Sequence, residues 1–473
     1  MAAVSSSMKK MTLMFILIVM RFLARCAAQA VRLPDYNSSS SVKGYATITI
    51  QHMSHRRYNH IVAGLQEMQG RAGTSAMAET DNELAATSTP VDSGFYLGGN
   101  DYYARLTVGD SPGRELYFHM DTGSDVTWIQ CEPCKKCYKQ LDDEPVYDPR
   151  AESTTVRDVS GDSRLCAALG PSRTSRAGSR RCTYEIDYAD DSTTAGKLIT
   201  ETLTLDSGQS FSDIPIGCSN LNEGYFSPSA GLLGLSRGFL AFHSQLRQHS
   251  VDLPHTFSYC LPRMYSSDTS TLTFGAPIDP RHTVFTPLFV NPNPVFRTYF
   301  YVQITHIKVG IEHLLLPSRL FDIHPRTHKG GAIIDTGSTS CQLPEIAYTA
   351  LRDTLKNAIS ANAPQLELAE PSSAALDLDT CYRLKVGVPE GERFAGVPSV
   401  IFGFAGGAEL EVPPQIAFVF INKTKKPRNR FCLSFSIIQA EDGITILGNL
   451  LQQRVRVTLD MENERVGFTP NAC

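Results

Sequence analysis

The four-residue motif Asp-Thr-Gly-Ser occurs twice in the chain, and its aspartates could carry out acid–base chemistry. Asp121 follows an apolar, strand-like run in YFHMDTGSDVTW (117–128), and Asp335 follows another in GAIIDTGSTS (331–340). At roughly 5–7% usage of each residue type, a given tetrapeptide should occur by chance about once in ~10⁵ positions. Asp, Gly and Ser also form turns well, so two ordinary turns are the alternative interpretation, but chance does not explain the repetition after two strands.

Two aspartates held within a few ångströms of each other would form an acid–base pair. Like charges at that distance raise one of the two pKa values, so the pair shares a proton, and one carboxyl acts as base while the other acts as acid. The base can take a proton from a water molecule that attacks an amide carbonyl, and the acid can stabilise the tetrahedral oxygen. The glycine lets the backbone approach closely, and the Thr and Ser hydroxyls can hold the carboxylates. We expect neither a metal nor a cofactor.

Short strands must position the two aspartates, because the pattern from about residue 96 consists of alternating or β-branched runs separated by Gly, Pro and Asp. We expect strands in YYARLTVG (102–109), ELYFHM (115–120), KLITETLTL (197–205), TYFYVQITHIKVG (298–310), ITILGN (444–449) and QRVRVTLD (453–460). Helical patterns are few, and the best are LAFHSQLRQ (240–248) and PEIAYTALRDTLKNAIS (344–360). The chain is therefore predicted to be mostly β.

The doubled motif belongs to a longer internal repeat. About a hundred residues after each aspartate comes an apolar-apolar-Gly stretch, AGLLGLSRG at 230–238 and ITILGNLLQQ at 444–453. Two copies of one unit, each bringing one carboxylate, predict two similar lobes that face each other. We place the N-terminal lobe at 96–285 and the C-terminal lobe at 286–473.

The N-terminus is typical of a secreted protein. Two lysines precede the ten-residue apolar run MTLMFILIVM, and small residues follow it in ARCAAQA, so residues 1–30 are predicted to be a signal peptide. A membrane anchor is the alternative, but this run is too short to span a bilayer. We therefore expect a protein without a membrane anchor that is secreted to the extracellular space or delivered to the vacuole.

Residues 31–95 differ from the segments on either side. They contain no cysteine, and their flanks NSSSS and AATSTP are rich in Ser, Thr and Ala. We interpret them as a propeptide, with a disordered tail as the alternative. The composition of the whole chain, 42% hydrophobic and 19% charged with a net charge of −4, is that of a globular protein and gives no indication of a nucleic-acid partner.

Cysteine usage agrees with secretion. Cys26 lies in the signal peptide, so eleven of the 12 cysteines remain, and in an oxidising compartment most should form disulfides with at least one left over. CEPCKKC (131–137) could instead be a metal or redox site, although no histidine at ligand spacing lies nearby. Sequons at Asn37 and Asn422 predict N-glycosylation.

The chain resembles the pepsin-type aspartic proteases, and within them the plant nepenthesin-like group, from about residue 96 to Cys473. The segments that carry the resemblance are MDTGSDVTWIQCEPCKKC, CTYEIDYADDSTTAGKLITETLTL, AGLLGLSRG, FSYC, AIIDTGS and ILGNLLQQRVRVTLDMENERVGFTPNAC. The resemblance implies a bilobed, pepsin-like β fold whose active cleft lies between two pseudo-symmetric lobes. It also implies a secreted aspartic endopeptidase that cleaves protein or peptide substrates at acidic pH, and we expect a monomer.

Matched residue by residue, the resemblance assigns roles within the site. Asp121 and Asp335 match the catalytic pair. Tyr188 matches the flap tyrosine that covers bound peptide, and Trp128 matches the residue whose indole N–H supports it. The residues that match active-site support are Thr122, Gly123, Ser124, Thr336, Gly337 and Ser338.

The same likeness implies a disulfide pattern. We expect the pairs Cys131–Cys134, Cys137–Cys218, Cys166–Cys182, Cys260–Cys473 and Cys381–Cys432. This pattern leaves Cys341 unpaired, and we interpret it as a buried, apolar side chain rather than a nucleophile.

Two departures from the family pattern fall near the site. The flap has Tyr188-Ala189-Asp190-Asp191-Ser192 where relatives usually have Tyr-Gly-Asp-Gly-Ser. Alanine is costly wherever such a turn needs a positive φ, so we expect slower turnover than in family members with the glycine-rich flap, and no change of reaction. His119 stands where relatives usually have an aliphatic residue; it should pack on the strand face, and a positive charge there would bias the pKa of the pair.

Two other functions compete with peptide hydrolysis. A non-catalytic pepsin-fold binding protein, such as a plant glycosidase inhibitor, typically loses one catalytic element, whereas both Asp-Thr-Gly-Ser motifs are intact here. A glycosidase also uses two carboxyls, but it would not explain the symmetric repeat. The sequence therefore favours the peptidase.

Overall fold

The computed structural model describes residues 86–141, 144–226, 228–276, 278–371, 378–420, 430–440 and 443–473. The predicted signal peptide, nearly all of the predicted propeptide and both sequons lie outside the described residues and stay predictions. None of the helices in the described ranges is both long enough and apolar enough to cross a membrane.

The largest sheet joins the two halves of the chain. Its strands are β1 (Thr87–Ser93), β2 (Tyr102–Val108), β3 (Arg114–Asp121), β4 (Trp128–Gln130), β5 (Arg157–Asp158), β6 (Thr183–Asp187), β7 (Thr193–Leu205), β8 (Ser210–Glu223), β9 (Gly231–Gly234), β10 (Thr256–Cys260), β11 (Ser270–Phe274), β12 (Val284–Pro287), β26 (Val455–Asp460) and β27 (Arg465–Pro470). They lie in the order β12-β27-β26-β10-β11-β1-β2-β3-β9-β4-β8-β7-β5, with β6 paired to β7. Strands from the two halves of the chain therefore meet where β26 pairs with β10.

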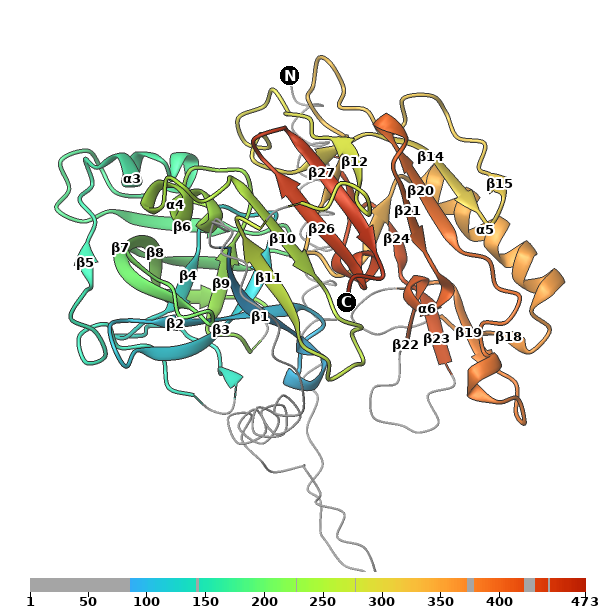
Figure 1. Ribbon diagram of the computed structural model, residues 1–473, viewed down its shortest axis with the longest axis horizontal. Coiled ribbons are helices and arrows are strands. Elements are labelled where there is room, and N and C mark those ends of the chain that lie inside the picture. Colours follow the sequence, from blue (N-terminus) through green and yellow to red (C-terminus); the bar gives the residue numbers. More distant parts are fainter. Residues whose placement is uncertain are drawn as a thin grey trace, which may run out of the picture. The chain divides into compact units, whose positions relative to one another are not determined.

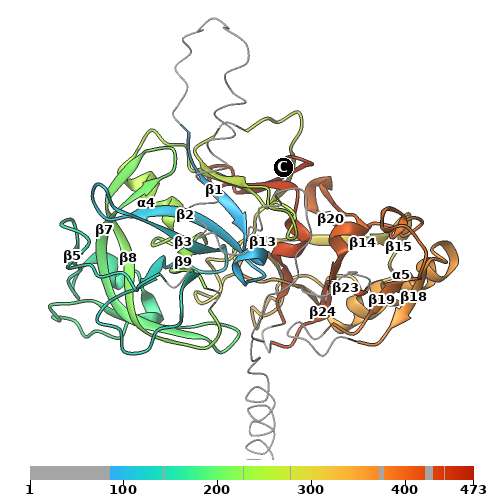
Figure 2. The same cartoon turned by 90° about the horizontal axis from the view of Figure 1, so that it is seen from below.

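Three smaller sheets belong to the second half. They are formed by β13 (Tyr301–Val302), β16 (Ala332–Ile334), β25 (Thr445–Leu447), β17 (Cys341–Leu343) and β24 (Phe435–Ile437); by β15 (Glu312–His313), β14 (Ile304–Val309), β20 (Val400–Phe404) and β21 (Glu409–Val412); and by β18 (Leu366–Ala369), β19 (Cys381–Leu384), β23 (Arg430–Leu433) and β22 (Phe418–Phe420). Figure 1 shows β2–β9 on one side, β14–β24 on the other, and β10, β11, β26 and β27 between them, and Figure 2 shows the same division from below. The predicted bilobed β fold is confirmed.

The described helices are α3 (Arg164–Ala167), α4 (Phe242–His249), α5 (Glu345–Asn362) and α6 (Pro414–Ala417). The two longest, α4 and α5, are those predicted from the sequence. In α5, Leu351, Leu355 and Ile359 are buried at a spacing of four residues, so one face of the helix packs on the core. The six predicted strand segments also form strands.

The internal repeat is visible in the pairing of the strands. In the first half β3 runs parallel to β9, and β4 pairs with β9 in the antiparallel and with β8 in the parallel direction. In the second half β16 runs parallel to β25, and β17 pairs with β25 in the antiparallel and with β24 in the parallel direction. Each Asp-Thr-Gly-Ser loop therefore follows the first strand of an equivalent four-strand unit.

The glycine of each apolar-apolar-Gly stretch is required by close packing. A Cβ on Gly234 would lie 2.5 Å from the backbone of Asp125, and one on Gly448 would lie 2.3 Å from the carbonyl oxygen of Ser340. Real Cβ atoms do not approach backbone atoms so closely. These glycines let β9 and the segment after β25 pass directly behind the two loops.

One predicted boundary leaves a strand of the largest sheet in the propeptide, and another falls inside a strand. Residues 87–93, placed in the predicted propeptide, form β1, which pairs with β2 and β11. The predicted division between lobes at 285/286 lies within β12, which pairs with β27 of the C-terminal hairpin. The position of propeptide cleavage stays a prediction.

Two of the predicted disulfide pairs are wrong. The structure pairs Cys131 with Cys218 and Cys134 with Cys137. The reason is the parallel pairing of β4 with β8, in which Ile129 lies opposite Cys218, so that Cys131 at the end of β4 comes within 5.3 Å of Cys218 between Cα atoms. All three cysteines of CEPCKKC are thereby bonded, so none is a thiolate that could bind a metal at the alternative metal site.

The remaining cysteines are arranged as the likeness implied. The structure has the disulfides Cys166–Cys182, Cys260–Cys473 and Cys381–Cys432. Cys341 is the unpaired cysteine of the described ranges, and burial raises the pKa of its thiol well above the ordinary value. A buried thiol that stays protonated is a poor nucleophile.

Candidate active site

The first predicted aspartate lies at the end of β3. Asp121 is 6% exposed, and the loop that follows turns back over its carboxylate. The Gly123 N–H donates to Asp121 Oδ1 at 2.8 Å, and the Ser124 hydroxyl donates to Asp121 Oδ2 at 2.5 Å. Because both oxygens accept hydrogen bonds from residues of the same Asp-Thr-Gly-Ser motif, the orientation of the carboxylate is fixed.

The second aspartate is held in the same way. Asp335 directly follows β16 and is 7% exposed. The Gly337 N–H donates to Asp335 Oδ1 at 2.9 Å, and the Ser338 hydroxyl donates to Asp335 Oδ2 at 2.6 Å. The repeated tetrapeptide therefore gives each carboxylate the same two donors, a glycine N–H and a serine hydroxyl.

Thr122 and Thr336 join the two loops. The Thr122 N–H donates to Thr336 Oγ1 at 3.1 Å, and the Thr336 N–H donates to Thr122 Oγ1 at 2.9 Å. Each hydroxyl also donates to the strand before the opposite loop, from Thr336 to the Met120 carbonyl at 2.9 Å and from Thr122 to the Ile334 carbonyl at 3.3 Å. This reciprocal set, which is buried, fixes the two aspartates relative to each other.

The two carboxylates lie close together. A Cβ on Gly337 would meet Asp121 Oδ1 at 2.2 Å and Asp335 Oδ1 at 3.3 Å, so both oxygens border one point that only glycine leaves open. Burial, and then the charge of Asp121, raise the pKa of Asp335 to about 7, although hydrogen bonds from Ser338 and Gly337 act in the opposite direction. Such a pair can hold one proton in acid solution while the other carboxyl is ionised.

The predicted flap tyrosine lies close enough to Asp121 for the charge of that carboxylate to act on it. Tyr188 lies between β6 and β7, and its hydroxyl oxygen accepts the Trp128 indole N–H at 2.8 Å. Phe226, which the sequence analysis missed, packs edge-on against both rings at centroid distances of 5.1 Å from Trp128 and 5.9 Å from Tyr188. Burial raises the pKa of Tyr188 and the charge of Asp121 adds to this rise, so the phenol stays protonated.

The flap turn corrects one expectation. Asp191 has a φ of +64°, whereas Ala189 is not in the left-handed region. Aspartate is one of the few residues that adopt this conformation readily. The turn is closed by a Tyr188 N–H to Ser192 carbonyl bond at 2.8 Å, and the Asp190 carboxylate accepts the Ser192 N–H and hydroxyl, both at 3.0 Å. The expectation that Ala189 strains the flap is therefore wrong.

A carboxyl that the sequence analysis missed braces the first loop from behind. Asp125 Oδ1 accepts hydrogen bonds from the Ser236 hydroxyl and, at 3.1 Å, from the Gly238 N–H. Burial raises the pKa of Asp125 to about 6, the bond from Gly238 opposes the rise, and the charge of Asp121 adds to it. This contact could have been predicted, because the first half of the repeat contains both the segment DTGSD and, about a hundred residues later, the segment LSRG.

The second loop is braced by amides instead. Asn449 donates from its side chain to the Thr336 carbonyl at 3.1 Å, and its backbone N–H donates to the Ser338 carbonyl at 2.8 Å. Gln452 donates from its side chain to the Asp335 carbonyl at 3.3 Å. Both amides are buried polar residues within the otherwise apolar stretch after β25, and that contrast was the available signal.

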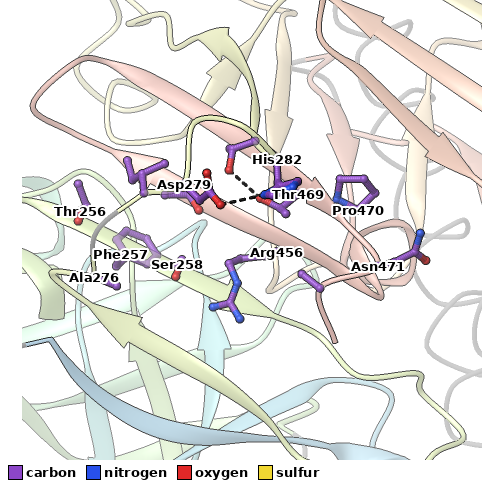
Figure 3. A pocket seen from close by; sticks show the side chains of 14 residues that line it. Thr256, Phe257, Ser258, Ala276, Asp279, His282, Arg456, Thr469, Pro470 and Asn471 are labelled. Carbon is purple, nitrogen blue, oxygen red and sulfur yellow. Dashed lines mark hydrogen bonds and ion pairs between the residues drawn. The ribbon is translucent and has the colours of Figure 1, made fainter. Parts of the chain in front are cut away.

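A separate hollow of about 480 Å³ does not contain the pair (Figure 3). Arg456 and the ion pair of Asp279 with His282, at 2.8 Å, line it. Its other polar lining residues are Asn471 and the hydroxyl-bearing Thr256, Ser258, Thr283, Thr458 and Thr469. Asp279 is the one carboxylate among its lining residues, so it has no second carboxyl with which to share a proton, and no three His, Cys, Asp or Glu side chains of the described ranges form a metal-binding group.

Two families of known proteins match the chain in succession. Residues 102–276 match the family described as Xylanase inhibitor N-terminal, and residues 299–470 match Xylanase inhibitor C-terminal. Protein ASPARTIC PROTEASE IN GUARD CELL 2 of Arabidopsis thaliana is 32% identical over 93% of this chain and 91% of its own length. The chain belongs to the plant aspartic proteases of the pepsin type. Aspartic proteinase nepenthesin-2 of Nepenthes gracilis, another member, is 32% identical over 83% of this chain and 82% of its own length.

Two solved structures share the fold of this aspartic protease. The crystal structure of edgp has a TM-score of 0.64 at 18% identity, covering 83% of this chain and 96% of its own. Basic 7S globulin from soybean has a TM-score of 0.60 at 17% identity, covering 81% and 96%. At these identities the likeness concerns the fold alone.

Proposed function

We propose that this aspartic endopeptidase hydrolyses peptide bonds in proteins at acidic pH, with Asp121 and Asp335 sharing one proton. The observation that carries the proposal is the matched pair of loops, in which two buried carboxylates from the two halves have the same donors and are cross-linked by two threonines. Because the two groups titrate as a unit, the shared proton is assigned to the pair and not to one carboxyl.

The proposed reaction uses the pair as base and then as acid. The ionised carboxylate takes a proton from a water molecule, whose oxygen bonds to the carbonyl carbon, while the protonated carboxyl gives its proton to the carbonyl oxygen. The tetrahedral intermediate then breaks its C–N bond: the nitrogen takes the proton of one carboxyl, and the other carboxylate takes a hydroxyl proton from the intermediate. This releases the amine and the new carboxylic acid and leaves the pair with one proton, as at the start. Tyr188, held by Trp128, is proposed to close over the peptide during these steps.

We also propose that the enzyme acts as a monomer outside the cytosol, in the extracellular space or the vacuole. The predicted signal peptide supports this location, and so do five disulfides in the described ranges, because such bonds persist in oxidising compartments. The propeptide would be removed from the active form by cleavage before β1, because that strand belongs to the largest sheet.

The names of the matching families raise inhibition of a xylanase as the second candidate. An inhibitor that acts only by binding does not need two buried carboxylates with matched hydrogen-bond donors, and burying such groups close together costs free energy. Both sets of donors are complete here, so peptide hydrolysis is the better-supported function.

The test is hydrolysis of a denatured protein by the processed enzyme at acidic pH, with and without a statine-type inhibitor. We expect cleavage that the inhibitor blocks and that the variant Asp335→Asn lacks. Absence of cleavage by correctly folded wild-type enzyme over the acidic range, or cleavage that persists in Asp335→Asn, would overturn the proposal.

A further inference from the structure

His119 shares the sheet face that presents the first aspartate. Side chains alternate along β3, so Tyr117, His119 and Asp121 point to the same side. On the neighbouring strand β2, Tyr103 lies directly opposite His119, and the two rings meet edge to face with centroids 6.3 Å apart. The imidazole is therefore fixed on the side of the sheet where the pair lies.

A carboxylate holds this imidazole and also contacts the second loop. His119 Nε2 lies 3.9 Å from Asp101 Oδ1, and the two side chains are only 17% and 10% exposed. The distance is too long for a hydrogen bond, and Nε2 is buried without a hydrogen-bond partner, but charges still interact at this range. Asp101 Oδ1 also accepts the Thr339 hydroxyl at 3.3 Å. Thr339 directly follows Ser338, which holds Asp335, so Asp101 connects His119 with the second loop.

Carboxyl groups lie around His119. The titratable groups that lie against it or interact with its charge are Asp101, Asp335 and Tyr103, two carboxyls and a phenol. Histidine gains a proton as pH falls below neutrality. Its positive charge lowers the pKa of Asp335, whereas burial and Asp121 raise it.

We propose that His119, held by Asp101, is a positioning residue that keeps one carboxylate of the pair ionised at lower pH than the pair alone would allow. A cation favours the ionised form of a nearby acid. The enzyme loses its base when both carboxyls are protonated, so His119 extends hydrolysis further into acid. An aliphatic residue at this position would pack on the same strand face but would supply no charge. The inference rests on the proposed function.

The test compares pH profiles of kcat for a fluorogenic peptide. In His119→Ile and His119→Gln, we expect the acid limb, where the rate falls as both carboxyls become protonated, to move up by about 0.5–1 pH unit. His119→Lys, which keeps a cation, should retain the wild-type acid limb. The matched control is His306→Ile: His306 of β14 also faces a carboxylate, Glu409 at 3.2 Å, but lies outside the site and should leave the profile unchanged.

The outcomes separate charge from packing. His119→Gln with an unchanged acid limb, or His119→Lys with the same shift as His119→Ile, would overturn the inference. If a variant turns over too slowly, the pH dependence of statine-type inhibitor binding, measured by calorimetry, should show the same shift without requiring catalysis. A wild-type enzyme that cleaves no peptide would overturn the proposed function itself, whereas an active wild type with no shift in the variants would overturn only the role of His119.

Discussion

The first and second Asp-Thr-Gly-Ser loops hold their carboxylates with the same donors, at 2.8 and 2.5 Å in one and 2.9 and 2.6 Å in the other. Behind the carboxylates the two loops differ. The first is braced by the carboxyl of Asp125 and by a disulfide between Cys131 and Cys218, whereas the second is braced by the amides of Asn449 and Gln452. The equivalent strands β17 and β24 carry no disulfide within the described ranges.

This difference shows which parts of the repeat the chemistry constrains. Two carboxylates that share a proton must be held alike, because either may be required as base or acid along the reaction. The support behind each loop has only to fill space and satisfy buried polar groups. The first half meets that need with a group that titrates, so the two loops should respond differently to pH.

The largest expected effect comes from the carboxylates themselves. Asp121→Asn and Asp335→Asn should each reduce kcat by about 10³-fold or more, since neither remaining carboxyl can supply both base and acid. The measurement is peptide hydrolysis by each purified variant, with circular dichroism to show that the fold is intact. Equal losses of kcat would support the equivalence of the two loops, and a variant that keeps about a tenth of the wild-type rate would contradict it.

The disulfide behind the first loop should contribute more stability than its neighbour. Cys131–Cys218 closes a sequence separation of 87 residues, and Cys134–Cys137 closes one of 3. By loop-closure entropy, Cys131→Ser/Cys218→Ser should lower the free energy of unfolding by about 4–5 kcal/mol and Cys134→Ser/Cys137→Ser by about 2 kcal/mol. Chemical denaturation of both double variants measures this, and equal losses would contradict the assigned role of the longer bridge.

The titrating brace predicts a pH dependence of stability. The pKa of Asp125 is raised in the folded state to about 6, so the fold binds a proton there that the unfolded chain releases. This contribution is fully present below about pH 4, the usual range of an aspartate, and is lost as pH rises through about 6. Over this pH range, the free energy of unfolding of Asp125→Asn should therefore fall by about 1–3 kcal/mol less than that of the wild type.

The measurement is the free energy of unfolding of wild type and Asp125→Asn at about pH 4 and pH 6.5. Subtracting the variant from the wild type cancels the contribution of Asp335, whose raised pKa has the same sign. A difference that stays constant with pH would show that Asp125 does not titrate in the fold. Asn449→Gln, which alters the brace of the second loop without adding a charge, is the matched control and should not change the slope.

The smallest effect is expected in the flap. Asp191→Gly should raise kcat at most about twofold, because glycine removes the modest cost of the left-handed backbone that aspartate already tolerates. Ala189→Gly should not raise it, since Ala189 has no positive φ. Steady-state kinetics of the two single variants checks this, and a larger gain from Ala189→Gly than from Asp191→Gly would contradict the structure of the turn.

Residues repeated in the sequence were predictable, and residues that act in only one half were not. Asp121, Thr122 and their counterparts were found because a doubled motif after two strands needs an explanation. Asp125 and Asn449 escaped because each is a common polar residue in one half only, and its partner is more than 100 residues away along the chain.

The disulfide error has a physical cause of the same kind. The pairs Cys131–Cys134 and Cys137–Cys218 were implied by likeness, but the parallel pairing of β4 with β8 decides which thiols meet. Short-range sequence patterns do not reveal the register of two strands that lie this far apart in the chain. The flap turn was misjudged similarly, because the φ of Ala189 depends on hydrogen bonds made by its neighbours.

The most direct test of the account is the pH profile of kcat/KM for the wild-type enzyme, which reports the titration of the free pair. A shared proton predicts a bell-shaped profile with its maximum in acid. The alkaline limb should fall as pH rises through the raised pKa of Asp335, and a statine-type inhibitor should abolish the rate throughout. A rate that is flat or rises between about pH 5 and 8 would contradict the shared-proton mechanism.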